Sequence, residues 1–221
     1  MNIFDIMGPV MIGPSSSHTA GAARIGLITR HLLGCRPAAV ELVLHGSFAA
    51  TGKGHGTDRA LVAGLLGMRP DDIRIPRAFA LAREAGMEVK VSTAVLRGAH
   101  PNTVLLRVRD SAGRQMEVDA SSLGGGRVRV NAIDGLEATF TGDYPTLIIR
   151  NEDKPGIVSE VTSLLSRYGA NIATMQLYRD RRGGLAVMVM EFDEGLPPEL
   201  IPALSGLSGV VRCTYLDMEE N

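Results

Sequence analysis

The last third of the chain has the pattern that most constrains its fold. Residues 146–150 have the apolar composition of a buried strand, and apolar residues then recur at helical spacing over 157–168. Gly169 stands where a glycine commonly ends a helix. Further elements follow, namely strands over 171–178, 185–192 and 210–216 and a short helix over 197–204. The order strand, helix, strand, strand, helix, strand predicts a ferredoxin-like βαββαβ unit.

The rest of the chain is less regular and predicts a different domain. A length of 221 residues suits one large or two small domains, and the segment 141–145, with its Gly and Pro, marks a boundary. We therefore expect domains at 1–142 and 143–221. The first should contain helices over 18–33, 57–66 and 76–85, and strands over 40–44, 87–96, 103–109, 115–120, 127–133 and 136–141. The expected fold class is α+β, an irregular α+β domain followed by the ferredoxin-like unit.

Composition excludes several classes of protein. The formal net charge is -1, and aromatic residues make up 4% with no Trp, which argues against a nucleic-acid partner. The two cysteines, Cys35 and Cys213, are too few for a disulfide framework, a structural zinc site or an iron–sulfur cluster held by this chain alone. Residues 1–9 have no basic segment before an apolar run, and no membrane span is predicted. The expected location is the cytoplasm.

The first cluster of polar residues is Gly-Pro-Ser-Ser-Ser-His-Thr at 13–19, directly before a helix of small residues. Ser15, Ser16, Ser17 and Thr19 supply hydroxyl groups around His18. Free N–H groups at a helix start carry partial positive charge, so such a place can bind a carboxylate or phosphate. The alternative is a serine-rich cap with a flexible loop, because one serine is enough to cap a helix.

The second cluster, at 45–58, is rich in glycine and is expected to form an open loop. Its glycines alternate with Lys53 and His55, so one loop would present a cation and a base suited to proton transfer near neutral pH. Thr57 or Asp58 would cap the next helix. The order of residues does not match a nucleotide-binding P-loop. The alternative is a glycine loop with surface His and Lys.

Two further clusters lie between predicted strands. Asn102 belongs to the segment 98–103, where it can donate and accept hydrogen bonds or simply form a turn. Gly124 and Gly125 belong to the segment 121–126, whose glycines allow a bulge, a backbone anion site or a loose hairpin.

The four clusters, in this order, resemble the β chain of the two-chain, iron–sulfur-dependent L-serine dehydratases of bacteria. The matching segments are 13–19, 52–58, 100–103 and Ser121 with 124–126. The C-terminal unit resembles an ACT domain, the small amino-acid-sensing module. Its matches are Asp153-Lys154-Pro155-Gly156 and Asn171-Ile172. The resemblance covers nearly the whole chain.

The resemblance implies a reaction, a cofactor and partners. L-serine would be converted to pyruvate and ammonia without pyridoxal phosphate. A [4Fe–4S] cluster would act as a Lewis acid on the serine hydroxyl, and its cysteines would belong to a separate α subunit, in agreement with the shortage of cysteine here. Potassium activation is associated with two-chain members of the family. The ACT unit implies self-association.

The resemblance also suggests roles for residues. The catalytic residues are expected to be His55 and His18, with His55 the first choice for the acid/base group and His18 the second, or else an orienting hydrogen-bond partner. Substrate-binding residues are expected to be Ser15, Ser16, Ser17, Thr19, Thr57, Asp58, Asn102, Gly124 and Gly125. Regulatory residues are expected to be Asp153, Gly156, Asn171 and Ile172. No metal ligand is expected in this chain.

Two other functions compete with this interpretation. A non-catalytic subunit could use the same clusters to sense serine or a phosphorylated precursor. A pyridoxal-phosphate enzyme would need a lysine for its Schiff base, and the three lysines, Lys53, Lys90 and Lys154, lie in unsuitable contexts.

Overall fold

The computed structural model describes residues 10–218, and the chain divides into two compact units, Met1–Asp134 and Gly135–Asn221. The boundary lies at a turn in which Asp134 and Gly135 both have positive φ. The sequence-based boundary lies after strand β6 (Leu136–Phe140) rather than before it. Within residues 10–218, no helix is long and apolar enough to cross a membrane.

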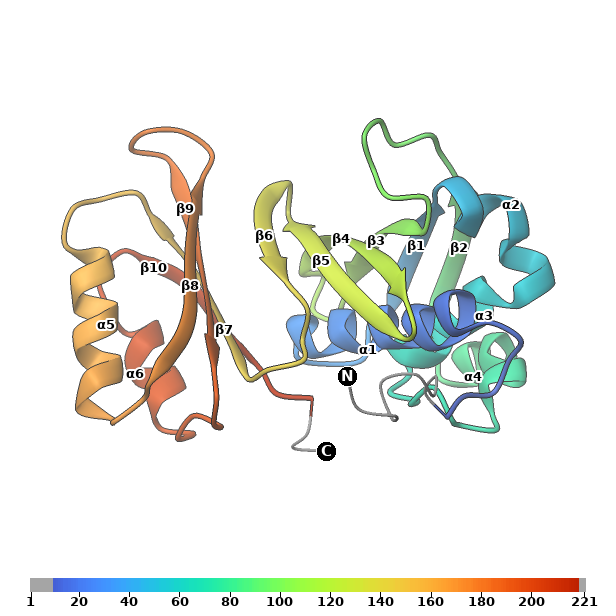
Figure 1. Ribbon diagram of the computed structural model, residues 1–221, viewed down its shortest axis with the longest axis horizontal. Coiled ribbons are helices and arrows are strands. Elements are labelled where there is room, and N and C mark those ends of the chain that lie inside the picture. The colour runs from blue at the N-terminus through green and yellow to red at the C-terminus, as the bar shows by residue number, and fades with distance from the viewer. Residues whose placement is uncertain (1–9, 219–221) are drawn as a thin grey trace. The chain divides into compact units, whose positions relative to one another are not determined.

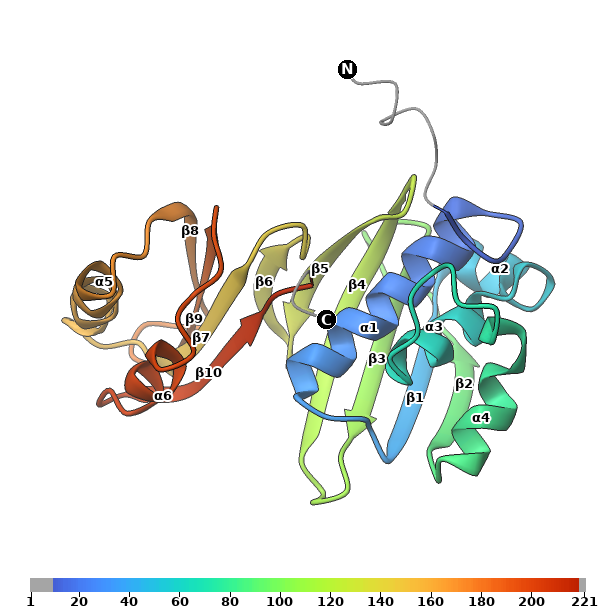
Figure 2. The ribbon, with the colours of Figure 1, turned by 90° about the horizontal axis from the view of Figure 1, so that it is seen from below.

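The first unit is built on a mixed sheet with helices on one face (Figures 1 and 2). The strands of this unit neighbour one another in the order β2-β1-β3-β4-β5, in which β1 and β2 are parallel and the other neighbours are antiparallel. The strands are β1 (Ala39–Leu44), β2 (Glu88–Thr93), β3 (Thr103–Arg109), β4 (Gln115–Gly124) and β5 (Arg127–Ile133). The helices on this face are α1 (Ala22–Leu33), α3 (Thr57–Leu65) and α4 (Ala78–Glu84), the last preceded by a short 3₁₀ turn, η3 (Ile75–Arg77). The expected α+β class is confirmed.

Helices α1 and α3 approach each other through glycine. A Cβ on Gly26 would lie 2.2 Å from the Leu61 carbonyl oxygen, and one on Gly64 would lie 2.0 Å from the Ala23 oxygen. Only glycine allows the two backbones to come this close. Helix α1 continues directly from a π-helix, η2 (Ser16–Gly21). The predicted helix over 18–33 therefore begins slightly earlier than expected.

The prediction of an open loop at 45–58 is wrong. A helix, α2 (Gly46–His55), fills most of this segment. Phe48 is fully buried, and the Ser47 N–H donates to the Pro101 oxygen at 2.7 Å, so tertiary contacts override the low helix propensity of glycine. The side chains of residues 51–53, Lys53 included, lie outside the described part of the structure.

The break between α2 and α3 also differs from expectation. Gly56, at φ 72°, occupies the N-cap of α3 and has no side chain with which to cap it. Thr57 is instead the first, fully buried residue of α3, and the Asp58 carboxylate accepts the neighbouring N–H of Arg59. The prediction that Thr57 or Asp58 takes the N-cap position is therefore wrong. In the same unit, β4 runs through Ser121 and Ser122 to Gly124, where a loop was expected, with a register shift between Ser122 and Gly124.

The second unit has the predicted βαββαβ order. Its elements are β7 (Thr146–Glu152), α5 (Ile157–Arg167), β8 (Ile172–Arg179), β9 (Leu185–Phe192), α6 (Leu200–Ser205) and β10 (Val210–Leu216). The sheet order is β10-β7-β9-β8, with antiparallel neighbours and both helices on one face (Figure 1). Leu147, Met188 and Phe192 form an apolar core with Val161 and Leu165 of α5. The ferredoxin-like prediction is confirmed.

Candidate active site

His18 lies at the centre of the polar clusters in the first unit. Ser15 is the N-cap of η2, and its Oγ accepts the backbone N–H of His18 at 3.3 Å. The same Oγ is 3.2 Å from His18 Nδ1, while Ser47 Oγ is 3.1 Å from His18 Nε2. Both nitrogens of this imidazole, which is 9% exposed, therefore have a serine partner.

Helix α2 brings three of its residues to the His18 ring. In addition to Ser47, the rings of Phe48 and His55 meet it edge-on, with centroids 5.4 Å and 5.1 Å away. Burial, followed by the charge of His55, lowers the pKa of His18 from 6.5, although a hydrogen bond with the backbone of Ser47 partly opposes the shift. The shift favours the neutral form of the His18 imidazole. His55, in contrast, is exposed and accessible to a ligand.

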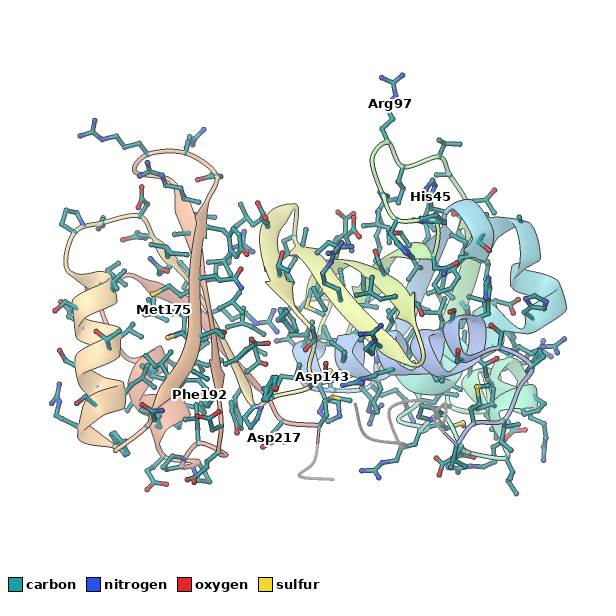
Figure 3. The ribbon with its side chains drawn as sticks, viewed as in Figure 1. His45, Arg97, Asp143, Met175, Phe192 and Asp217 are labelled. Carbon is teal, nitrogen blue, oxygen red and sulfur yellow. The ribbon has the colours of Figure 1, made fainter. Side chains whose placement is uncertain are left out.

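The third cluster is attached to the start of α2. A Cβ on Gly46 would lie 2.4 Å from the Pro101 oxygen, and the His45 N–H donates to the Thr103 oxygen at 3.0 Å. His45 Nδ1 accepts the N–H of Leu96, which ties down the loop after β2. Figure 3 shows Arg97 projecting outward from this loop, with His45 at its base. The expected turn at Asn102 is present, and its N–H donates to His100 Nδ1 at 3.2 Å.

The fourth cluster completes the arrangement. The Ser122 N–H donates to the backbone carbonyl oxygen of Asn102 at 2.9 Å, and this bond joins the third and fourth clusters. A Cβ on Gly21 would lie 2.1 Å from Ser122 Oγ, and one on Gly124 would lie 3.6 Å from Ser17 Oγ, so η2 packs on β4. Gly124 and Gly125 have φ values of 95° and 62°, which glycine adopts without strain. The four clusters, separated in sequence, are adjacent in the fold.

Several buried polar atoms of these clusters lack a hydrogen-bond partner among the described residues. They are Thr19 Oγ1, Thr57 Oγ1, Asn102 Oδ1 and Ser122 Oγ. An unsatisfied buried polar group costs about 1–3 kcal/mol, so such a group calls for a physical explanation. A small polar ligand that supplies the missing hydrogen bonds would provide one. Ser16 and Ser17 are half-buried on the first turn of η2, and Asp58 is half-buried with its own backbone contact.

The predicted regulatory residues of the second unit fall into two groups. The Asp153 carboxylate accepts the Gly183 N–H at 2.9 Å and pairs with Arg179 at 3.3 Å, and Gly156 is the N-cap of α5. Asn171 and Ile172 follow the other end of α5, where Asn171 borders a cavity of about 350 Å³. A helix of this length extends about 16 Å, so one copy of the unit does not bring the two groups together.

Sequence reasoning missed two residues. Ser47 was treated as part of an open loop, and only the buried Phe48 beside it could have indicated a helix that presents Ser47 to His18. Asn151 is 3% exposed, and its Oδ1 has no hydrogen-bond partner within residues 10–218. Its position just before the turn that contains Asp153 was the available signal.

The chain does not assemble a metal site from its own described residues. Within residues 10–218, no group of three His, Cys, Asp or Glu side chains is placed to hold a metal ion. Cys35 is exposed in the first unit, and Cys213 lies in the second, where burial raises the pKa of its thiol to about 11. A protonated thiol is a poor ligand. These residues do not fit an iron–sulfur cluster held by this chain alone.

Comparison with known proteins shows similarity over nearly the whole chain. Residues 2–97 match the family described as serine dehydratase beta chain, and residues 145–209 match the ACT domain. The Bacillus subtilis protein named "Probable L-serine dehydratase, beta chain" is 38% identical over 97% of both chains. The L-serine dehydratase beta chain of Peptoniphilus asaccharolyticus is likewise 38% identical over 97% of both.

A more distant similarity reaches a different enzyme. The D-3-phosphoglycerate dehydrogenase of Archaeoglobus fulgidus is 28% identical over 89% of this chain but only 37% of its own length. The near full-length matches at higher identity decide the family. This chain belongs to the family of L-serine dehydratase beta chains.

Proposed function

We propose that the chain is the β subunit of a two-chain L-serine dehydratase, which converts L-serine to pyruvate and ammonia. The observation that carries the proposal is the 38% identity to L-serine dehydratase beta chains over nearly the whole length. The meeting of four polar clusters around His18 and His55 supports it, because an amino acid substrate needs both an anion site and a base.

The proposal assigns the [4Fe–4S] cluster to an α subunit that this chain joins. The scarcity of cysteine and the separate positions of Cys35 and Cys213 support that assignment. Such a cluster supplies a Lewis acid for the hydroxyl group that leaves the substrate. The part played by this chain is to bind the substrate and to move its α-proton.

His55 is the proposed base for the α-proton. It is exposed, and within the described residues its ring meets one other ring, that of His18. The lowered pKa of His18 favours the neutral form of that neighbour, so a proton accepted by His55 would not face a second positive charge 5.1 Å away. The proposed roles of His18 are to orient His55 and to keep the site free of an additional charge.

The substrate carboxylate is assigned to the start of η2. The hydroxyls of Ser15, Ser16, Ser17 and Thr19 lie there beside the first N–H groups of the helix. Thr57 and Asn102 offer the buried atoms that have no partner among the described residues, and the backbone around Gly124 and Gly125 borders Ser17. Asp58 is proposed as a support on the first turn of α3.

Regulation by the second unit is also a proposal. Asp153 and Gly156 lie at one end of α5, and Asn171 and Ile172 at the other. An effector that contacts both groups would therefore need two copies of the unit, which favours self-association. Activation by potassium and a cytoplasmic location remain predictions of the same proposal.

A second candidate is a sensing subunit without catalysis. The similarity to a portion of D-3-phosphoglycerate dehydrogenase favours it, since the region comparable to this chain makes up only 37% of that enzyme's length. The same clusters would then bind serine or a phosphorylated precursor as a signal.

Anaerobic copurification tests the two candidates. The full chain, used as bait in extracts of its source cells, is expected to recover an iron-containing partner and to form pyruvate from L-serine. The His55→Ala chain should recover the same partner with an unchanged cluster absorption spectrum but without pyruvate formation. Recovery of a stable chain with no iron partner and no pyruvate would favour the sensing subunit. Near-wild-type turnover by His55→Ala would remove His55 from the mechanism.

A further inference from the structure

Ser47 holds a position that the proposed function does not use. Its Oγ lies 3.1 Å from His18 Nε2, on the ring edge opposite the Ser15 contact. We propose that Ser47 is a positioning residue that holds the His18 imidazole in one orientation and in the tautomer protonated at Nε2. The consequence for catalysis rests on the proposed function, whereas the state of the ring does not.

Hydrogen-bond accounting points to this tautomer. Ser15 Oγ already accepts the backbone N–H of His18, so its own proton remains available to donate to Nδ1. With Nδ1 acting as an acceptor, a neutral ring carries its proton on Nε2 and donates it to Ser47.

Ser47 can act in this way because its own position is fixed. Its N–H donates to the Pro101 oxygen at 2.7 Å, and the preceding Gly46 packs so closely on Pro101 that a Cβ would not fit. The following residue, Phe48, is fully buried and meets the same imidazole edge-on. The start of α2 is therefore held by the loop before β3, and the His18 ring is set against it.

The geometry connects Ser47 to the proposed base. His18 meets Phe48 and His55 at interplanar angles of 66° and 82°, so a rotation of its ring would disturb the contact with His55. Ser47 and His55 belong to the same helix, and His18 bridges them from η2. Loss of the Ser47 hydroxyl should therefore misplace His55 without removing a substrate contact.

Nuclear magnetic resonance of the full chain, labelled with ¹⁵N in histidine, tests the proposal directly. Wild type should show His18 as a single tautomer protonated at Nε2, with its signal identified by its loss in His18→Gln. Ser47→Ala should give a mixture of tautomers or a broadened signal. Ser47→Thr keeps the hydroxyl and should retain the wild-type tautomer, and Ser111→Ala, in an exposed turn, is the matched control.

A further variant distinguishes loss of the hydrogen bond from a general loss of folding. Ser47→Cys keeps the approximate size of the side chain but replaces the hydroxyl with a weak hydrogen-bond partner, so it should also lose the single tautomer. A wild-type ring protonated at Nδ1, or an unchanged His18 signal in both Ser47→Ala and Ser47→Cys, would overturn the proposal.

Kinetics of the reconstituted two-chain enzyme add the catalytic readout. Ser47→Ala should lower kcat by about 10- to 100-fold, by analogy with the effect of losing a partner that orients a metal-bound histidine, with KM for serine nearly unchanged. Ser47→Thr should restore most of kcat. If the wild-type complex forms no pyruvate, the proposed function fails, but the tautomer experiment still decides the role of Ser47. A raised KM with normal kcat would instead make Ser47 a substrate contact.

Discussion

The two units use polar residues in opposite ways. In the first, the predicted site lies inside the fold, where His18, Thr19 and Thr57 are buried and two helices touch through glycine. In the second, an apolar core supports the fold, and Asp153 and Asn171 lie on loops outside it. Loop residues can change with little effect on a core, whereas buried polar residues affect stability and function together. The comparison therefore predicts which mutations change function without changing stability, and which change both.

The largest expected effect is on catalysis in the first unit. His55→Gln should lower kcat of the reconstituted enzyme by about 10²- to 10⁴-fold, the usual contribution of a general base. Because His55 is exposed, the free energy of unfolding should change by less than about 0.5 kcal/mol. Steady-state pyruvate formation and urea unfolding measure the two quantities. The control is Arg167→Ala on α5, which should leave both unchanged.

The next effect concerns how glycine is used in each unit. Gly64→Ala places a Cβ 2.0 Å from a backbone oxygen of α1 and should destabilise the first unit by about 2–4 kcal/mol. Gly169→Ala faces open space at φ 73° and should cost the second unit only about 1 kcal/mol. Equal losses would mean that α1 and α3 can move apart at little cost.

The positions of the tyrosines allow the two units to be followed separately. All four, Tyr144, Tyr168, Tyr178 and Tyr215, belong to the second unit, and the chain has no Trp. Tyrosine fluorescence therefore follows unfolding of the second unit, while far-ultraviolet circular dichroism follows both. Gly64→Ala should shift the circular dichroism transition and leave the fluorescence transition in place.

Acid should also distinguish the units, because all five histidines belong to the first. Burial lowers the pKa of His18 and of His31 below 6.5 in the folded state. Below that pH, His18 and His31 bind protons more readily in the unfolded chain than in the folded chain. The first unit should therefore lose stability as the pH falls from 6.5 to 5. Each histidine contributes at most about 1.4 kcal/mol per pH unit.

Urea unfolding at pH 7.5 and pH 5.5 measures this acid sensitivity. His18→Gln should reduce the loss seen by circular dichroism, and the fluorescence transition of the second unit should change less than that of the first. A second unit that is equally sensitive would assign the effect to carboxylates rather than to His18 and His31.

The difference between the units also explains what the sequence could predict. The order of elements over 146–216 follows from local apolar spacing, and the structure agrees with it. Helix α2 was missed because its stability comes from Phe48 and Pro101, which are far apart in sequence, while its glycines favour a loop locally. Contacts of Ser15 with His18 are local and were within reach of sequence reasoning. The contact of Ser47 with His18 depends on α2 and was not.

The smallest effect on stability comes from a matched pair of buried threonines. Thr57 and Thr146 are both fully buried, but Thr57 Oγ1 has no hydrogen-bond partner within residues 10–218, whereas Thr146 Oγ1 donates to the Tyr144 oxygen at 2.8 Å. Thr146→Val should therefore cost about 1 kcal/mol, as one lost hydrogen bond does. Thr57→Val should be neutral or stabilising, because a methyl group replaces a hydroxyl that is buried without compensation.

The effect of the same two substitutions on KM for serine tests whether the Thr57 hydroxyl binds substrate. If it binds substrate, Thr57→Val should raise KM for serine by about 10-fold or more in the reconstituted enzyme, the effect of losing a hydrogen bond to a charged group. Thr146→Val should leave KM unchanged while it lowers stability. A Thr57→Val enzyme with normal KM would show that the unpaired hydroxyl is not a substrate contact, and Thr57 would then leave the proposed site.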